Sequence, residues 1–402
     1  MISDLQDILS TNTRTMKKSA IRELLKLTQK QNLISFAGGF PSPESFPTEK
    51  LKSIISTMME TEAAFALQYG TTEGDPLLRK QLLEMYKKQG FEIELENLII
   101  VTASQQSLDL ISKVFLNPND YVICELPSYL GGLQAFNSYG AKMAGVRMDD
   151  QGMCSVGLEE TILELQKQNI KPKFIYTIPD FQNPTGVTMS YERRLEILSI
   201  AKKYDLLILE DTPYRELRYE GEHIPTIYSL DNTGQVINLG TFSKIFAPGF
   251  RIGWVIAHPD ICDKIVTAKQ AADLCTPPFT QRIAARYLEA GYFEPQLEYM
   301  VNLYRGKRNA MIGALEKYMP ECVTWTIPEG GLFLFVTCPE NINTIEVFTK
   351  AIEKNVAFVA GTFFYCDGTG QNTMRLNFSF SSEEINIEGI KRLAETIKEF
   401  IV

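Results

Sequence analysis

The sequence contains few residues that could bind a metal ion or build a framework of disulfide bonds. Only two histidines are present, His223 and His258, and the seven cysteines are widely spaced, at positions 124, 154, 262, 275, 322, 338 and 366. Structural zinc sites need closely spaced cysteine and histidine pairs, so no metal site is expected. The odd number of cysteines and a start, MISDLQDILS, without the apolar core of a signal peptide predict a reduced, cytoplasmic protein.

The chain also lacks long apolar runs, a basic surplus, internal repeats and low-complexity tracts. No run approaches the ~20 apolar residues of a membrane-spanning helix, so no membrane contact is expected. A net charge of -9 argues against nucleic acid as a partner, because such surfaces neutralise phosphates with clustered lysine and arginine. What is present is ordinary: 402 residues, 45% hydrophobic and 22% charged, enough for roughly two or three domains and for an enzyme.

Between residues 70 and 260, short apolar segments alternate with helical patterns. This alternation predicts a mostly parallel sheet that is buried on both faces. The connection between residues 239 and 251 contains no obvious crossover helix, so the strand after it is expected to run antiparallel. The predicted strands lie at 98–101, 121–124, 174–178, 206–209, 236–239 and 251–257, with helices near 105–115 and 192–203.

The two ends of the chain show other patterns. An amphipathic helix is expected at 19–29, followed by a turn-rich stretch at 36–47, and residues 1–45 are interpreted as an N-terminal arm joining a small domain. Residues 46–285 are predicted to form the large domain. Residues 286–402 are predicted to form a small C-terminal α+β domain, because strand-like runs at 331–336, 356–361 and 374–380 alternate with helical segments.

Polar residues follow the ends of the predicted parallel strands. Asn183 lies in 180-DFQNPTG-186, Asp211 ends 206-LLILED-211 and precedes Tyr214, and Lys244 follows the strand VINLG. Right-handed crossovers bring the carboxyl ends of parallel strands to one edge, so these side chains should converge there. Taken singly, each residue also has a simpler interpretation: Lys244 as an exposed lysine, Asp211 as a solvated acid at a strand end, and Asn183 and Tyr214 as parts of turns.

Two further features predict an anion pocket at the same edge. Ser104 and Gln105 stand where a helix should begin after 98-LIIV-101, and free N–H groups at a helix start attract anions. Ser104 could equally be a plain N-cap. Arg251, seven residues after Lys244, adds a permanent cation. A lysine, a carboxylate, a tyrosine and an anion pocket together are typical of a pyridoxal phosphate site.

The motifs NPTG, DxxY and SK, with RIG downstream, resemble those of the class I/II pyridoxal phosphate-dependent aminotransferases of fold type I. The segments 35-SFAGGFPSPESFP-47, 104-SQQSL-108 and 20-AIREL-24 are similar to the subgroup of 2-aminoadipate, kynurenine and multi-substrate aromatic aminotransferases. The resemblance extends from about residue 19 to 380. It implies an α/β fold with a mostly parallel seven-stranded sheet flanked by helices, a smaller α+β domain, and a homodimer with shared active sites.

The resemblance also implies an activity and a set of cofactor contacts. The protein would transfer the amino group of an L-amino acid (aromatic, 2-aminoadipate or similar) to a 2-oxo acid, with 2-oxoglutarate expected, by a ping-pong mechanism. Lys244 would hold the cofactor and move the proton at the substrate Cα, Asp211 would pair with the pyridine nitrogen, and Tyr214 and Asn183 would bond its phenolic oxygen. The phosphate would be bound by Ser104, Gln105, Thr241, Ser243 and Arg251, the ring would stack on Tyr129, and Tyr69 would reach the phosphate of the other subunit.

For the substrate, the resemblance implies a clamp on the α-carboxylate by Arg375. Because residues alternate along a strand, Arg375 is expected to face the cleft while Met374 and Leu376 face the core. Gly39, Asn183, Tyr129 and Arg22 are further substrate contacts. Arg22 would pair with an acidic side chain, or is simply an exposed charge on an amphipathic helix. Thr241 replaces a common serine and keeps its hydroxyl.

Two other functions on this fold stay open at this point. One is a pyridoxal phosphate-dependent β-eliminating lyase, and the other is a regulatory or sensor domain like those fused to winged-helix DNA-binding segments. The acidic net charge and the few residues before position 19 disfavour the sensor. Fold alone does not separate the three functions. The donor also stays open, because Phe40, Tyr69 and Tyr129 could line a pocket for aromatic substrates.

Overall fold

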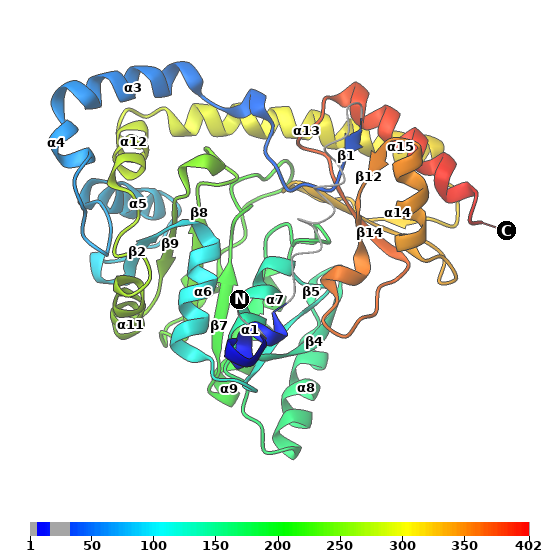
Figure 1. Cartoon of the computed structure of the whole chain (residues 1–402), viewed down its shortest axis with the longest axis horizontal. Coiled ribbons are helices and arrows are strands. Elements are labelled where there is room, and N and C mark those ends of the chain that lie inside the picture. Colours follow the sequence, from blue (N-terminus) through cyan, green and yellow to red (C-terminus); the bar gives the residue numbers. More distant parts are fainter. Residues whose placement is uncertain (1–5, 17–32, 402) are drawn as a thin grey trace.

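The computed structural model describes residues 6–16 and 33–401, and its largest element is a mixed sheet of eight strands (Figure 1). The predicted helix at 19–29, and Arg22 within it, lie outside the described residues. In order across the sheet the strands are β2 (Leu98–Val101), β9 (Gly253–Ile256), β8 (Val236–Thr241), β7 (Leu207–Asp211), β6 (Phe174–Thr177), β3 (Tyr121–Leu126), β4 (Lys142–Asp149) and β5 (Gly152–Met153).

The directions of these strands confirm the predicted mixed sheet. Strands β8, β7, β6, β3 and β4 are parallel, and β9 pairs antiparallel with β8 and with β2. The chain between β8 and β9 contains only a short 3-10 turn, η4 (Pro248–Phe250), and no crossover helix. The chain therefore enters β9 at the same edge of the sheet where β8 ends, and β9 runs antiparallel to β8. The eighth strand, β5, is a two-residue addition that pairs antiparallel with the end of β4.

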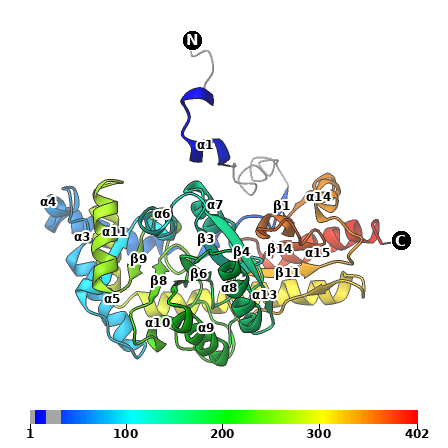
Figure 2. The same ribbon diagram turned by 90° about the horizontal axis from the view of Figure 1, so that it is seen from below.

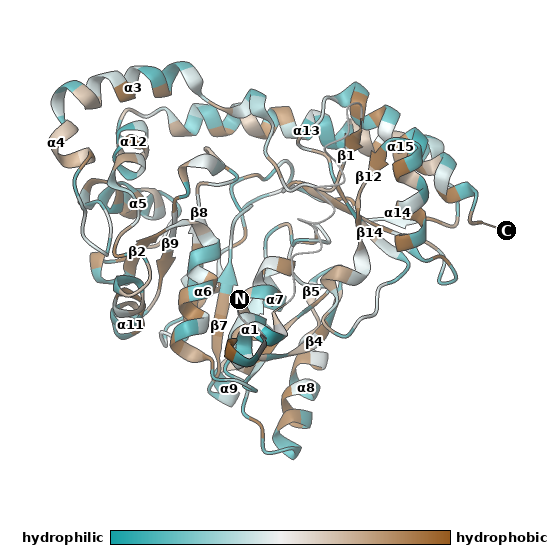
Figure 3. Cartoon of the chain, viewed as in Figure 1, coloured by the Kyte–Doolittle hydropathy of each residue, from teal (hydrophilic) through white to brown (hydrophobic). Residues whose placement is uncertain are grey.

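Both faces of the large sheet are buried, because alternate residues enter different apolar clusters. On β3, Val122 and Cys124 pack in one cluster, and Ile123 packs in the other. Figure 3 shows the sheet strands β7 and β9 largely brown, whereas α3 and α13 mix teal and brown. The surrounding helices are α5 (Pro76–Lys88), α6 (Ala103–Phe115), α7 (Leu130–Ser138), α8 (Ser155–Lys167), α9 (Tyr191–Tyr204), α10 (Ile227–Leu230), α11 (Pro259–Gln270) and α12 (Pro278–Glu289).

The C-terminal part contains a second, antiparallel sheet of four strands. In order they are β10 (Thr324–Trp325), β11 (Phe333–Thr337), β14 (Thr373–Asn377) and β13 (Val359–Ala360). Its helices are α13 (Phe293–Tyr318), α14 (Thr344–Glu353) and α15 (Glu383–Lys398). In Figure 1, α13 runs along the top of the molecule from the side of α12 to α15. The predicted boundary after residue 285 falls within α12, and the division into domains stays a prediction.

The N-terminal part contributes one strand to a third, two-stranded sheet. Strand β1 (Ile34–Ser35) pairs in parallel with β12 (Val356–Ala357), which ties the chain ahead of residue 36 to the C-terminal part. The helices of this part are α1 (Thr11–Thr15), α3 (Thr48–Thr61) and α4 (Ala63–Ala66). Figure 2 shows α1 at the periphery, on the side of α7. Across residues 6–16 and 33–401, no helix is both long and apolar enough to cross a membrane, and no cluster of His, Cys, Asp and Glu is arranged to bind a metal.

Candidate active site

A cavity of about 390 Å³ opens at the carboxyl edge of the parallel strands. The ends of β7 and β8 contribute Asp211 and Thr241, and the small sheet contributes Phe333 from β11 and Arg375 from β14. The convergence expected from the strand pattern is therefore present. The predicted residues that line this cavity are Gly39, Ser104, Gln105, Tyr129, Asn183, Asp211, Tyr214, Thr241, Ser243, Lys244, Arg251 and Arg375.

Lys244 lines this cavity and is not the exposed lysine that a surface turn would hold. Its side chain is partly buried, and Nζ donates a hydrogen bond of 2.7 Å to the carbonyl oxygen of Gly39. Burial lowers the pKa of Lys244 to about 8, with further lowering by the positive charges of Arg375 and Arg251. An amine with this pKa is substantially neutral near pH 8, so it can act as a nucleophile or as a base.

Asp211 has a buried carboxyl group in which one oxygen accepts a hydrogen bond and the other has no partner among the described residues. Its Oδ2 accepts a hydrogen bond of 3.0 Å from the hydroxyl of Tyr176. Its Oδ1 is buried and has no hydrogen-bond partner in the described part of the chain. Burial raises the pKa of Asp211 to about 7, and the bond from Tyr176 acts against that rise. A positively charged N–H group in the cavity would satisfy Oδ1 and favour the ionised form.

Tyr176 was not predicted as a site residue, although its hydroxyl bonds Asp211 directly. Tyr176 lies within β6, in the apolar run FIYT, and it is fully buried. A tyrosine on a buried strand usually needs a partner for its hydroxyl, and this was the one available signal. Ile178 and Phe333 also line the cavity unpredicted, because apolar residues carry no chemical signature in a sequence.

Arg375, Asn183 and Tyr214 form a chain of hydrogen bonds along one wall. Nη1 of Arg375 donates to Asn183 Oδ1 at 2.9 Å, and Asn183 Nδ2 donates to the Tyr214 hydroxyl at 3.2 Å. Arg375 Nη2 donates to the carbonyl oxygen of Ala37 at 2.7 Å, whereas its Nε is buried without a partner among the described residues. The pKa of the guanidinium is lowered to about 10 by burial, so it keeps its charge at neutral pH.

The surroundings of Arg375 also hold its orientation. Its guanidinium lies 4.2 Å from the ring centroid of Phe333 and 5.0 Å from that of Phe364. Met374 and Leu376, its neighbours on β14, are fully buried in the main apolar cluster, as the alternation predicted.

The first turn of α6 lines another part of the cavity. Thr102 holds the N-cap position there, so Ser104 is not the N-cap that was one interpretation of it. Ser104 Oγ is buried and lacks a hydrogen-bond partner within 6–16 and 33–401. A Cβ on Gly253 would lie 2.9 Å from Ser104 N, so a glycine in β9 lets the start of α6 approach the sheet. Free N–H groups at this helix start form a site for an anion.

Two hydroxyl residues, Thr241 and Ser243, and the cation of Arg251 also line the cavity. Thr241 Oγ1 lies 3.0 Å from Ser243 Oγ, and Ser243 N donates to Thr241 Oγ1. Arg251 has a left-handed backbone with φ of 54° and lines the cavity beside Pro248. Gln105 donates to the carbonyl oxygen of Gly131 at 3.2 Å. Together with the α6 start, these cavity-lining groups supply donors suited to a phosphate.

Of the three predicted residues still to be placed, Tyr129 lines the cavity, whereas Tyr69 and Arg22 are not part of its described lining. Tyr129 stands at the N-cap of α7 and forms part of the cavity wall; a Cβ on Gly131 would collide with its ring. Tyr69 is 81% exposed and lies in a separate hollow with Phe65, so it does not line the cavity of its own chain. Arg22 falls outside the described residues.

Comparison with known proteins confirms the predicted family. The profile of the family described as aminotransferase class I and II matches residues 21–393. The chain is 48% identical to aromatic-amino-acid aminotransferase 1 of Thermococcus litoralis, over 98% of this chain and 95% of that protein. It is 38% identical to the 2-aminoadipate transaminase of Thermus thermophilus, over 95% and 94% of the two chains.

A solved structure agrees over the whole chain. The kynurenine aminotransferase of Pyrococcus horikoshii superposes with a TM-score of 0.96 at 48% identity, covering 100% of this chain and 99% of that one. The chain therefore belongs to the class I and II aminotransferases.

Proposed function

We propose that this protein is a pyridoxal phosphate-dependent aminotransferase that moves the amino group of an L-amino acid to a 2-oxo acid. The observation that carries the proposal is the meeting of a lysine of lowered pKa, a buried carboxyl group and a buried arginine in one cavity: Lys244, Asp211 and Arg375. Membership of the family and the named relatives support the same reaction.

The donor set fits pyridoxal phosphate. Three buried polar atoms on the cavity wall lack hydrogen-bond partners among the described residues: Asp211 Oδ1, Ser104 Oγ and Arg375 Nε. They match the pyridinium nitrogen, the phosphate and the substrate carboxylate, in that order. When bound, the cofactor supplies an aldehyde that condenses with amines and a ring that withdraws electrons from the substrate Cα.

The residues of the cavity would divide the work as follows. Lys244 would hold the cofactor, and its amine would hold and return the proton at the substrate Cα. Asp211 would keep the pyridine nitrogen protonated, because an ionised carboxylate beside that nitrogen stabilises the N–H cation. Asn183 and Tyr214 would donate to the phenolic oxygen, and Tyr129 would stack on the ring. The phosphate ligands would be Ser104, Gln105, Thr241, Ser243 and Arg251.

The substrate would be held by its α-carboxylate. Arg375 offers its open Nε edge and a fixed guanidinium plane, and Gly39 and Asn183 border the same space. Phe40 lines the cavity, is 48% exposed, and packs edge-on against Phe380 with ring centroids 6.0 Å apart. This apolar border favours aromatic donors. The named relatives support 2-aminoadipate or similar amino acids as further donors, and we propose 2-oxoglutarate as the acceptor. Arg22 stays a predicted contact for an acidic side chain.

We propose in addition a cytoplasmic homodimer with shared active sites. Tyr69 and Phe65 are 81% and 41% exposed, and both line the hollow next to Pro278. Exposed large apolar side chains that gather in this way favour a protein interface. In the dimer, Tyr69 would reach the phosphate of the partner subunit.

A half-reaction tests the proposed function. The protein loaded with cofactor is mixed with each L-amino acid of a panel, without any 2-oxo acid. We expect one equivalent of oxo acid per active site and no ammonia, and added 2-oxoglutarate should restore the starting absorption spectrum. Catalytic release of ammonia and pyruvate would indicate a lyase. Binding of amino acids without any product, across the whole panel, would indicate a sensor.

A further inference from the structure

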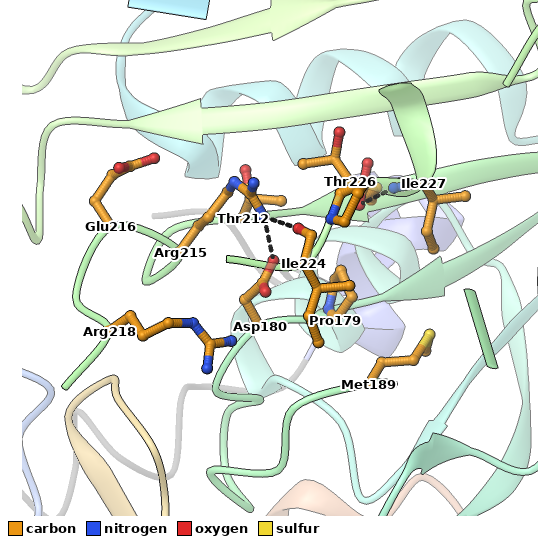
Figure 4. Close-up of polar contacts among 12 residues, drawn as sticks. Pro179, Asp180, Met189, Thr212, Arg215, Glu216, Arg218, Ile224, Thr226 and Ile227 are labelled. Carbon is orange, nitrogen blue, oxygen red and sulfur yellow. Dashed lines mark hydrogen bonds and ion pairs between the residues drawn. The ribbon is translucent and has the colours of Figure 1, made fainter. Parts of the chain in front are cut away.

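A buried ion cluster joins the two loops that carry Asn183 and Tyr214. Asp180 opens the loop that contains Asn183, and Arg215 follows Tyr214 directly in the chain. Asp180 Oδ1 accepts a hydrogen bond of 2.7 Å from Arg194 Nη2, and Asp180 Oδ2 lies 3.5 Å from Arg215 Nη1. Figure 4 shows Arg215 reaching both Asp180 and the carbonyl oxygen of Ile224.

The cluster is charged despite its depth. The exposed fractions are 1% for Asp180, 0% for Arg194 and 8% for Arg215. Burial alone would raise the pKa of Asp180, but the charges of Arg194 and Arg215 outweigh burial and hold that pKa below its usual value. Removing one partner would leave an uncompensated buried charge, so each member of the cluster depends on the others.

Arg194 connects the cluster to the surrounding backbone. Its Nε donates to the carbonyl oxygen of Met189 at 3.1 Å, its Nη2 to that of Pro179 at 3.3 Å, and its Nη1 to that of Pro225 at 3.0 Å. Because Arg194 sits on α9, these bonds attach the start of the Asn183 loop to a helix. Arg215 donates to Ile224 at 2.6 Å and attaches the residue after Tyr214 to the same cluster.

The loop after Asp180 needs such anchors because its backbone is strained. Phe181 has φ of 52°, in the left-handed region that bulky residues avoid. The Arg218 guanidinium lies 4.8 Å from the ring centroid of Phe181, and Gln182 Nε2 donates to Glu125 at 2.9 Å. Held at each of these positions, the loop delivers Asn183 into the cavity, where Nδ2 lies 3.2 Å from the Tyr214 hydroxyl oxygen.

We infer that Asp180 and Arg215 are positioning residues that fix Asn183 and Tyr214 relative to each other, and so fix the donors presented to the phenolic oxygen of the cofactor. The inference rests on the function proposed above. Donors to a phenolate oxygen reduce its hold on a proton. Loosening Asn183 and Tyr214 should therefore raise the pH midpoint of the visible absorption change of the lysine-bound cofactor.

The test compares this midpoint in the full-length, cofactor-loaded wild type and in four variants. Asp180→Asn removes the shared charge, and Arg215→Met removes only the link beside Tyr214. Tyr214→Phe gives the shift for complete loss of one donor. Arg193→Met is the matched control, because Arg193 is the neighbour of Arg194 on α9 but pairs with Asp149 at 3.0 Å, away from both loops.

We expect Asp180→Asn and Arg215→Met to raise the pH midpoint by about 0.5 to 1 pH unit, which is the effect of weakening roughly one hydrogen bond. Arg193→Met should keep the wild-type midpoint. If Asp180→Asn does not fold, Arg215→Met decides. An unchanged pH midpoint in folded Arg215→Met, or an equal shift in Arg193→Met, would overturn this inference and leave the proposed function intact. A wild type without a visible band would remove the proposed function and this inference with it.

Discussion

Replacing Arg375 by methionine should weaken the donor and the acceptor together, because both substrates carry a carboxylate for one guanidinium. The side chain is 2% exposed, is oriented by Asn183 and Ala37, lines the cavity, and has an Nε without a hydrogen-bond partner among the described residues. A hydrogen bond to a charged group contributes ~1.5–3 kcal/mol, so loss of a bidentate pair costs about 3–6 kcal/mol. With each ~1.4 kcal/mol worth a factor of ten, kcat/KM should fall roughly 10²- to 10⁴-fold for both substrates.

The assay is steady-state kinetics with donor and acceptor varied separately. Arg375→Lys should recover only part of the loss, because an ammonium lacks the planar fork. The control is an amine that matches the donor but lacks its carboxylate, and its slow reaction should change little between wild type and variant. A loss confined to the donor, or an equal loss with the carboxylate-free amine, would refute the assignment of Arg375.

Three further outcomes follow from the same cavity. Asp211→Asn should keep its fold, by circular dichroism, yet lose roughly 10- to 100-fold or more in kcat, because a charge-assisted bond to the pyridine nitrogen is lost; near-normal turnover would remove the carboxylate from the mechanism. The pKa of Lys244 is lowered to about 8, so its neutral amine forms as the pH rises through that value. The rate at which the apo-protein captures the cofactor, measured by stopped flow, should therefore rise through about pH 8 and then become constant. A midpoint near 10, the ordinary lysine range, would contradict this. Light scattering should give about twice the 45.5 kDa chain mass, with Tyr69→Phe weakening cofactor binding, whereas an active monomer would exclude shared sites.

The strands of the large sheet could be predicted because their residues are apolar and buried on both faces. The expected strand at 98–101 coincides with β2. Strand β7 ends at Asp211, as the segment 206–211 indicated, whereas β3 continues beyond its predicted end to Leu126 and β8 continues to Thr241. Backbone pairing with neighbours keeps the polar residues there in the strand, and no local pattern reveals such pairing. Strand β4 was not predicted, because Lys142, Arg147 and Asp149 interrupt its partly exposed sequence.

Only part of the candidate site could be predicted from the sequence. Residues with distinctive chemistry at strand ends, such as Asp211 and Lys244, could be placed because topology sends those ends to one edge. Tyr176 and Phe333 could not, because their roles depend on which way a buried side chain points. The ion cluster at Asp180 was also out of reach, since Arg194 and Arg215 approach it from separate elements. Such contacts are decided by tertiary packing and not by local pattern.

The most direct measurement of the central claim locates the cofactor on the chain. The cofactor-loaded protein is reduced with borohydride, digested, and mapped by mass spectrometry for a pyridoxyl-modified lysine. We predict one modified peptide, carrying the label on Lys244, and loss of both label and yellow colour in Lys244→Ala. A label on any other lysine, or a label that persists in Lys244→Ala, would contradict the site described above.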